Sequence, residues 1–233
     1  IRVGINSGSL PVRLRESPKA THGVGQGGKD SMVKSALDYI KILERMDFYD
    51  IMVSLKASDV LSTIEAYRLF SKRSKYPLHL GVTAAGPVST GIVKSSIGIG
   101  ALLLDGIGDT IRVSLTGDPV EEVVAARNIL QALNLRNFGP EVISCPTCGR
   151  CQVDLERIAK KVVSGIKYQV ASKNKNSMLR IAIMGCEVNG PGEAREADIG
   201  IACGKGSGVI FKKGKVVKRV EEKDIVKELL REL

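Results

Sequence analysis

The second half of the chain carries a set of soft metal ligands. Cys145 and Cys148 are separated by two residues, and Cys186 follows within the segment 185–193 (GCEVNGPGE). Two thiolates at this spacing on a tight turn bind a metal centre from one side, and a third thiolate from a distant strand end closes the site. This donor set suits an iron–sulfur cluster or a zinc ion.

A fourth ligand has three candidates in the sequence: Cys151, Cys203 and the carboxylate of Glu193. The chain has five cysteines in all. An odd number, with close spacing of three of them, does not fit the disulfide framework of a secreted protein. We therefore expect a metal-binding protein of the cytoplasm, where thiols stay reduced.

Polar and charged residues also fall at or near predicted strand ends in the first half of the chain. Arg112 and Ser114 are two residues apart in 111–115 (IRVSL), so both point to the same face of a strand. An arginine on such a face is costly unless it meets an anion, which favours a binding role. Lys56 ends another strand pattern, and a solvated loop position explains it equally well. His79 fits an oriented strand residue better than a catalytic base.

The segment 23–30 (GVGQGGKD) has nearly the spacing of a phosphate-binding P-loop. However, Asp30 stands where Ser or Thr should hold magnesium, and no strand directly precedes the segment. We therefore expect a flexible loop before a helix that begins at Ser31. A P-loop nucleotide hydrolase is a rival hypothesis that requires magnesium-dependent nucleotide binding at Lys29.

Composition restricts the class of protein further. The 233 residues suffice for one large or two small domains, and hydrophobic and charged residues, at 43% and 26%, are close to globular usage. The longest apolar run is well short of the roughly 20 residues of a membrane-spanning helix. The net charge of +10 favours anionic partners, whereas 4% aromatic residues and no Trp leave few stacking platforms for single-stranded nucleic acid.

A basic run lies near the C-terminus. It fits a solvated hairpin surface or, as a sharper alternative, a docking face for an acidic electron-transfer protein. The run comprises Lys212, Lys213, Lys215, Lys218 and Arg219.

These residues are positioned by strand and helix patterns that alternate about four times over the first 134 residues. We expect strands at 1–5, 51–55, 78–82 and 110–115, and helices at 31–46, 60–70, 92–104 and 119–133, the last with Asp118 as its cap. Such alternation predicts a parallel sheet, either half of an eight-stranded TIM barrel or a flavodoxin-like open sheet. The chain opens directly on a strand pattern without Met, so we expect its natural N-terminus to be missing.

The pattern changes near residues 136–140, where we place a domain boundary that gives domains 1–138 and 139–233. The second domain is expected to contain Cys-rich turns and a polar loop at 171–177. Its expected strands are 180–184, 198–202, 208–212 and 215–220, and its expected helices are 152–166 and 221–230.

Several motifs together resemble one family, the 4-hydroxy-3-methylbut-2-enyl diphosphate synthases of the methylerythritol phosphate route to isoprenoids. The resemblance covers the whole chain, as the C-terminal two thirds of a family member. It rests on residues 1–6 (IRVGIN), 54–59 (SLKASD), 78–83 (LHLGVT), 93–98 (VKSSIG), 108–114 (GDTIRVS), 145–148 (CPTC) and 189–193 (NGPGE).

The resemblance implies the C-terminal half of a TIM barrel followed by a small α/β domain that holds a [4Fe–4S] cluster. It maps the cluster ligands to Cys145, Cys148, Cys186 and Glu193, of which Glu193 is also the catalytic residue because it yields to substrate. The implied reaction opens the ring of 2-C-methyl-D-erythritol 2,4-cyclodiphosphate and expels water. The resemblance also implies a homodimer and electrons from reduced ferredoxin or flavodoxin, without a nucleic-acid or membrane partner.

The same resemblance assigns binding of the cyclic diphosphate to six positions. They are Arg2, Asn6, Lys56, Arg112, Ser114 and Asn189.

Two departures from the family pattern affect what this chain is expected to do. The family usually has Thr-Glu-Ala-Gly where this chain has Thr83, Ala84, Ala85 and Gly86. The resemblance implies that the family's Glu is an acid–base group, and Ala84 cannot transfer a proton. Cys151 adds a third cysteine to the motif, and we expect it to begin the following helix. The rival class is a zinc-stabilised nucleic-acid-binding module.

Overall fold

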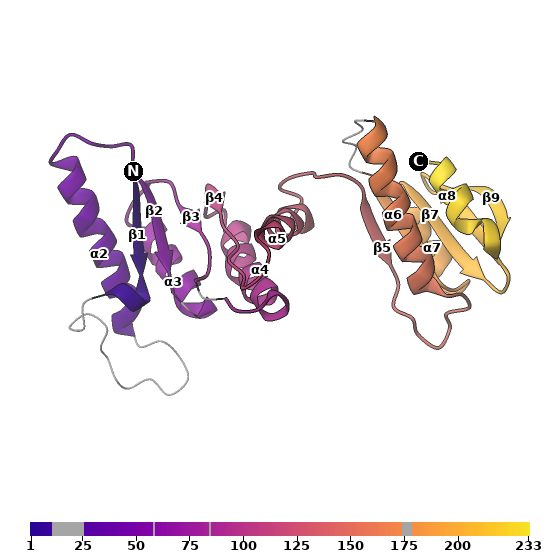
Figure 1. Ribbon diagram of the computed structural model, residues 1–233, viewed down its shortest axis with the longest axis horizontal. Coiled ribbons are helices and arrows are strands. Elements are labelled where there is room, and N and C mark those ends of the chain that lie inside the picture. The colour runs from indigo at the N-terminus through magenta and orange to yellow at the C-terminus, as the bar shows by residue number, and fades with distance from the viewer. Residues whose placement is uncertain (11–25, 58, 84, 174–178) are drawn as a thin grey trace. The chain divides into compact units, whose positions relative to one another are not determined.

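The computed structural model describes residues 1–10, 26–57, 59–83, 85–173 and 179–233. They form two compact units, Ile1–Arg136 and Asn137–Leu233. Each unit combines helices with β-strands, which confirms the mixed α/β class (Figure 1). The two units are considered one at a time below.

The first unit alternates strands and helices. Its strands β1 (Arg2–Asn6) and β2 (Met52–Lys56) pair in parallel, as do β3 (His79–Leu80) and β4 (Thr110–Ile111), and a parallel bridge from Val53 to Leu78 links the two pairs. A short 3-10 turn, η1 (Ser7–Ser9), follows β1. The helices are α2 (Gln26–Glu44), α3 (Val60–Ser71), α4 (Val88–Leu104) and α5 (Pro119–Ala132).

Local side chains explain where two of these helices begin. The Asp59 carboxylate accepts a hydrogen bond from Ser62 N at 2.7 Å at the start of α3. The predicted cap at Asp118 is confirmed, because its carboxylate accepts from Val120 N at 2.9 Å. Each bond satisfies an N–H group that has no partner within its helix.

Helix α2 begins earlier than the sequence predicted. The expected loop at 23–30 is wrong from Gln26 onward, whereas 23–25 lie outside the described residues. Lys29 forms an ion pair with Glu65 of α3 at 2.8 Å, and Met32 is buried one turn later. These contacts outweigh the low helix propensity of the glycines.

Other predicted bounds in this unit also change. Helix α4 begins at Val88 instead of residue 92, because the Pro87 carbonyl accepts from Gly91 N at 2.7 Å and so starts the helix before its apolar pattern does. The third and fourth strands are only two residues long, although Arg112 N still donates to the Leu80 carbonyl at 2.9 Å beyond them.

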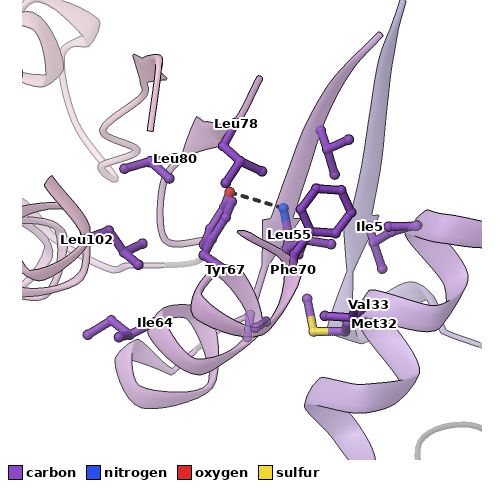
Figure 2. Packing of buried hydrophobic residues seen from close by; sticks show 14 of the residues in the cluster. Ile5, Met32, Val33, Leu55, Ile64, Tyr67, Phe70, Leu78, Leu80 and Leu102 are labelled. Atoms are coloured by element: carbon purple, nitrogen blue, oxygen red, sulfur yellow. Dashed lines mark hydrogen bonds between the residues drawn. The ribbon is translucent and has the colours of Figure 1, made fainter. Parts of the chain in front are cut away.

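Tyr67 joins the helix layer to two strands of the first unit. Its side chain is completely buried, and its hydroxyl accepts from Leu55 N at 3.0 Å and donates to the His79 carbonyl at 2.5 Å. Figure 2 shows the bond to Leu55 within the core, where Phe70 of α3 is also buried. Burial raises the pKa of Tyr67, so its hydroxyl keeps its proton. One side chain therefore satisfies backbone groups of both β2 and β3.

The second unit is a five-stranded sheet in the order β5 (Glu141–Ser144), β6 (Arg180–Met184), β7 (Ile199–Gly204), β8 (Ser207–Lys212) and β9 (Lys215–Glu221). Strands β5, β6 and β7 pair in parallel, whereas β8 and β9 form antiparallel hairpins. The remaining elements are α6 (Leu155–Lys173), α7 (Gly190–Glu196), η2 (Glu222–Asp224) and α8 (Ile225–Arg231).

Alternation along the strands divides the core of this sheet between its two faces. One face carries Ile181, Ile183 and Ile201, which pack with residues of α6 and α8. The other face carries Ala182, Met184 and Ala202, which pack with Ala194 of α7. Small residues on the second face let the short helix lie close to the sheet.

Several features of the second unit differ from the sequence prediction. The helix expected at 221–230 begins only at Ile225, because β9 runs to Glu221 and η2 occupies Glu222–Asp224. Strand β5 and helix α7 were not predicted, because β5 is very short and the Gly-Pro-Gly start of α7 is typical of a turn. Packing of Ala194 against the sheet stabilises the helix nevertheless. The loop expected from residue 171 is wrong up to Lys173, where α6 ends, and 174–178 lie outside the described residues.

Among the described residues, no helix has both the length and the apolar character that a membrane crossing requires.

The Tyr67 hydroxyl gives the first testable prediction. Tyr67→Phe removes a donor and acceptor while keeping the ring, and leaves Leu55 N–H and the His79 carbonyl buried without this partner. We expect the free energy of unfolding to fall by about 1–3 kcal/mol, measured by urea denaturation. Tyr39→Phe, at a tyrosine that is 56% exposed, serves as the control and should change stability by less than about 0.5 kcal/mol. Equal stability of the two variants would contradict the bridging role.

Candidate functional site

Two of the predicted ligands leave the sheet of the second unit at neighbouring strand ends. Cys145 directly follows β5, and Cys186 follows β6 after Gly185. Because Ser144 lies opposite Ile183 in a parallel pair, these segments emerge at the same edge. Gly185 N donates to the Cys145 sulfur at 3.2 Å, which fixes the two segments to each other.

Cys148 lies in the exposed loop after β5. Its N–H donates to the Pro146 carbonyl at 2.8 Å, and its carbonyl accepts from Cys151 N at 2.9 Å, so the motif forms tight turns. Hydrogen bonds from the Arg150 backbone and side chain lower the pKa of the Cys148 thiol. Arg150 was missed by the sequence analysis, although a cation two residues after a ligand cysteine is a readable signal.

Backbone N–H groups surround Cys186. Hydrogen bonds from Asn189, Gly190 and Val188 lower the pKa of this buried thiol, with a smaller contribution from the charge of Arg150. Hydrogen bonds to the charged form favour it, so the segment that leads into α7 stabilises a thiolate. Asn189 thus stabilises the Cys186 thiolate through its backbone N–H, a role that the residue type alone does not indicate.

Glu193 lies in the first turn of α7 and faces the same cavity as Cys145. The Asn189 carbonyl accepts from Glu193 N at 3.3 Å, which sets the start of the helix. The cavity has a volume of about 290 Å³. Its lining comprises Ile143, Ser144, Cys145, Pro146, Arg180, Met184, Glu193 and Glu196. A carboxylate and a thiol from separate elements are therefore available to one ligand.

The other two cysteines have different surroundings. Cys203 is fully buried in the apolar core, and burial, with a smaller effect of the Cys151 thiol, raises its pKa to about 12. Cys151 donates to the Val153 carbonyl at 3.3 Å, and its sulfur occupies the space beside Gly185, 2.5 Å from where a Cβ would lie. The predicted role of Cys151 as the start of the following helix is wrong, because α6 begins at Leu155.

Three thiols and one carboxylate are donors of a type that zinc and iron–sulfur clusters both accept. Among the described residues, no three Cys, His, Asp or Glu side chains are arranged to hold one metal ion. The environments of Cys148 and Cys186 favour the thiolate, and an N–H group already donates to the sulfur of Cys145.

The first unit brings three predicted cations together. Lys56, at the end of β2, is 8% exposed and has no hydrogen-bond or ion-pair partner among the described residues. Burial, then the charges of Arg112 and Arg2, lower its pKa to about 8. The two arginines disfavour the charged form of Lys56, and a group of like charges favours an anion beside it.

The predicted polar residues of this unit lie beside those cations. Arg112 Nε donates to Ser114 Oγ at 3.0 Å, which agrees with their expected common face. Asn6 is opposite Lys56 in the strand register, and its amide donates to Thr83 Oγ at 3.4 Å. Of the six expected substrate-binding residues, five therefore lie in the first unit, and Asn189 lies in the second.

Two other sequence features do not join this group. Lys29, the lysine of the P-loop-like segment, lies within α2 and forms an ion pair with Glu65 of α3. The protein itself therefore neutralises its charge. Ala84 lies outside the described residues.

Comparison with known proteins shows the family. Residues 1–127 match the family described as the GcpE TIM-barrel domain, and residues 141–233 match the GcpE protein C-terminal domain. The chain belongs to the GcpE family.

Individual relatives carry one shared name. The chain is 53% identical over all of its 233 residues to a protein of Thermodesulfovibrio yellowstonii, and 54% identical over 231 residues, 99% of its length, to one of Clostridium perfringens. Both proteins are called 4-hydroxy-3-methylbut-2-en-1-yl diphosphate synthase (flavodoxin), which confirms the resemblance drawn from the motifs. The chain spans 63% of the length of each relative.

Cysteine reactivity is predicted to follow these environments. We expect iodoacetamide to modify Cys148 first in the folded, metal-free chain, because this thiol is exposed and its pKa is lowered. Cys203 should react last, since it is buried and its pKa is raised to about 12. Peptide mass spectrometry over a time course measures the order. Reaction in urea is the control, in which the difference should disappear, and early modification of Cys203 in the folded chain would contradict the assignment.

Anion affinity is predicted to depend on pH through Lys56. Below about pH 8 the ammonium is charged and attracts an anion, and above that value the charge is lost. The affinity for inorganic pyrophosphate, measured by calorimetry, should therefore fall as pH rises through 8, by at most about tenfold per unit. Lys56→Arg keeps its charge over this range and should remove the fall. A flat profile in the unmodified chain would show that Lys56 does not face the anion.

Proposed function

We propose that this chain carries the diphosphate-binding and cluster-binding parts of a reductive enzyme of isoprenoid synthesis. The reaction converts 2-C-methyl-D-erythritol 2,4-cyclodiphosphate into 4-hydroxy-3-methylbut-2-enyl diphosphate. Two electrons and two protons enter, a ring C–O bond breaks, and water leaves. The observation that carries the proposal is that Cys145, directly after β5, and Glu193 of α7 line one cavity, while the surroundings of Cys148 and Cys186 favour the thiolate.

The first unit supplies recognition of the substrate in this proposal. It is the C-terminal half of a TIM barrel, with the binding groups at the ends of its strands. Arg2, Lys56 and Arg112 neutralise the two phosphates, and Asn6 and Ser114 add neutral hydrogen-bonding groups. Because Lys56 is buried, its attraction for a phosphate is screened less than that of an exposed lysine. Binding therefore orients the ring through its phosphates.

The second unit holds a [4Fe–4S] cluster through Cys145, Cys148, Cys186 and Glu193. When bound, such a cluster supplies electrons and a Lewis-acidic iron. A carboxylate is a harder ligand than a thiolate, so Glu193 would be the most weakly held of the four donors. Its place in the first turn of an exposed helix leaves it room to move. Asn189 lies between Cys186 and Glu193 and adds an amide for the substrate.

The same proposal includes the partners and the compartment. Reduced flavodoxin, which the relatives' names mention, or ferredoxin donates the electrons. The working form is a homodimer in the cytoplasm, where the ligand thiols stay reduced. Because Ala84 replaces a Glu of the family pattern, a chain with this residue lacks one carboxylate for proton transfer.

Anaerobic reconstitution tests the cluster site. We expect iron and acid-labile sulfide in equal amounts, at one cubane per chain, with a brown absorption. Cys145→Ser, Cys148→Ser and Cys186→Ser should each lower the iron content, whereas Cys203→Ser, at a core thiol, should retain it. Zinc without sulfide would overturn the proposal and support the zinc-stabilised nucleic-acid-binding module.

Glu193 has a matched control on its own helix. Glu196 lines the same cavity, one helical turn further along α7. We expect Glu193→Gln to change the electron paramagnetic resonance spectrum of the reduced cluster, because an iron loses its oxygen ligand. Glu196→Gln should leave that spectrum unchanged. The same spectrum in both variants would exclude Glu193 as a ligand.

A further inference from the structure

Thr83 lies three residues after β3, beside two residues of the proposed diphosphate site. Its N–H donates to the carbonyl of Ala57, the residue after Lys56, at 3.2 Å, and its Oγ accepts from the Asn6 amide at 3.4 Å. Asn6 is in turn opposite Lys56 in the parallel register of β1 and β2. Thr83 therefore lies at the edge of the sheet where these two strands end.

The side chain of Thr83 is on the face that Lys56 crosses. Val82 points to the helix layer, since a Cβ on Gly98 of α4 would lie 2.7 Å from Val82 Cγ2. Gly81 points the other way, because its Cβ would lie 3.4 Å from Lys56 Cε. Side chains alternate between the two faces of a strand, so Thr83 shares the face of Gly81. The hydrogen bond to the end of β1 agrees with this placement.

The Asn6 amide is fixed in one orientation by a backbone group. Its Oδ1 accepts from Gly8 N at 2.9 Å and so caps the short turn η1. Because a backbone N–H only donates, the other atom of the amide is the nitrogen, which donates to Thr83 Oγ. The Thr83 hydroxyl therefore accepts this bond and keeps its own hydrogen for another group. Among the described residues, that hydrogen has no acceptor.

Ser114 repeats this arrangement after β4. Its Oγ accepts from Arg112 Nε at 3.0 Å, and a guanidinium only donates. Within the part of the chain that the structure describes, the Ser114 hydroxyl hydrogen likewise has no acceptor. Two hydroxyls in the unit that holds the cations are thus both left as donors. A group that only accepts, such as an ionised phosphate oxygen, matches donors of this kind.

We propose that Thr83 is a further phosphate-binding residue, which donates its hydroxyl hydrogen to an oxygen of the diphosphate, and that Asn6 is the positioning residue that orients this hydroxyl. A neutral donor suits the place, because a further cation would add to the repulsion among Arg2, Lys56 and Arg112. The inference rests on the proposed diphosphate site and extends it to the segment that follows β3.

Calorimetry with inorganic pyrophosphate tests the role of Thr83. Thr83→Val keeps the branched shape and removes the hydroxyl, so we expect the affinity at neutral pH to fall about tenfold, as for loss of a hydrogen bond to a charged group. Thr83→Ser keeps the hydroxyl and should stay within about threefold of the unmodified chain. Urea denaturation shows which variants are folded, and Thr83→Ala replaces Thr83→Val if the valine variant is not. Unchanged affinity in a folded variant without the hydroxyl would overturn the proposal.

Salt dependence separates a neutral donor from a disturbed cation. Thr83→Val should weaken pyrophosphate binding by the same factor at low and high salt. Lys56→Met should lose more affinity at low salt, because salt screens the attraction between charges. A loss in Thr83→Val that disappears at high salt would show that the substitution acts through the cations, and would overturn the role of Thr83 as a donor.

A double-mutant cycle tests the positioning role of Asn6. Asn6→Ala removes the amide that occupies the Thr83 oxygen, and it should weaken pyrophosphate binding in the unmodified chain but much less in Thr83→Val. Fully additive losses would overturn the positioning role. Absence of pyrophosphate binding in the unmodified chain would overturn the diphosphate site and this inference with it, whereas binding that Thr83→Val retains in full would overturn the inference alone.

Discussion

Parallel strand pairing is the constraint on which both candidate sites depend. In the first unit the register places Asn6 opposite Lys56 at the ends of β1 and β2. In the second unit Ser144 lies opposite Ile183, so Cys145 and Cys186 follow neighbouring strand ends. Parallel strands end at the same edge of a sheet, and side chains that are far apart in the sequence collect there. One rule of topology thus assembles a cationic group in one unit and a thiol group in the other.

The two groups differ in charge. The cationic group of the first unit favours an anion, whereas the thiol group of the second unit favours a metal centre. The buried ammonium of Lys56 has cations as its charged neighbours, which lowers its pKa and favours an anion. Around Cys186, backbone N–H groups favour the thiolate and hence a metal centre. The cationic arrangement does not help the protein fold, since like charges repel and an unpaired buried cation is costly. Such local conflicts are typical of functional sites, where a bound group offsets them.

The sequence predicted elements well where a strong periodic pattern coincides with burial. Strand β6 and helices α3 and α5 match their expected ranges closely, and the Asp118 cap is confirmed. Prediction failed where tertiary contacts replace a pattern. Strand β5 is held by its pairing with β6, and α7 by Ala194 against the sheet, although its first residues are typical of a turn. Those contacts join residues distant in sequence, so a local pattern does not contain them.

The sequence by itself determined the chemistry that is available. It determined the cysteine spacing, the carboxylate in the 189–193 segment, and the shared face of Arg112 and Ser114. Only the tertiary structure decided which of the remaining donors shares a cavity with Cys145, and that donor is Glu193. It also decided that Lys56 is largely buried, at 8% exposed, and that the Nε2 atom of His79 is buried without a hydrogen-bond partner. Residue types and spacing are properties of the chain, whereas burial and charge coupling depend on neighbours that the fold supplies through space.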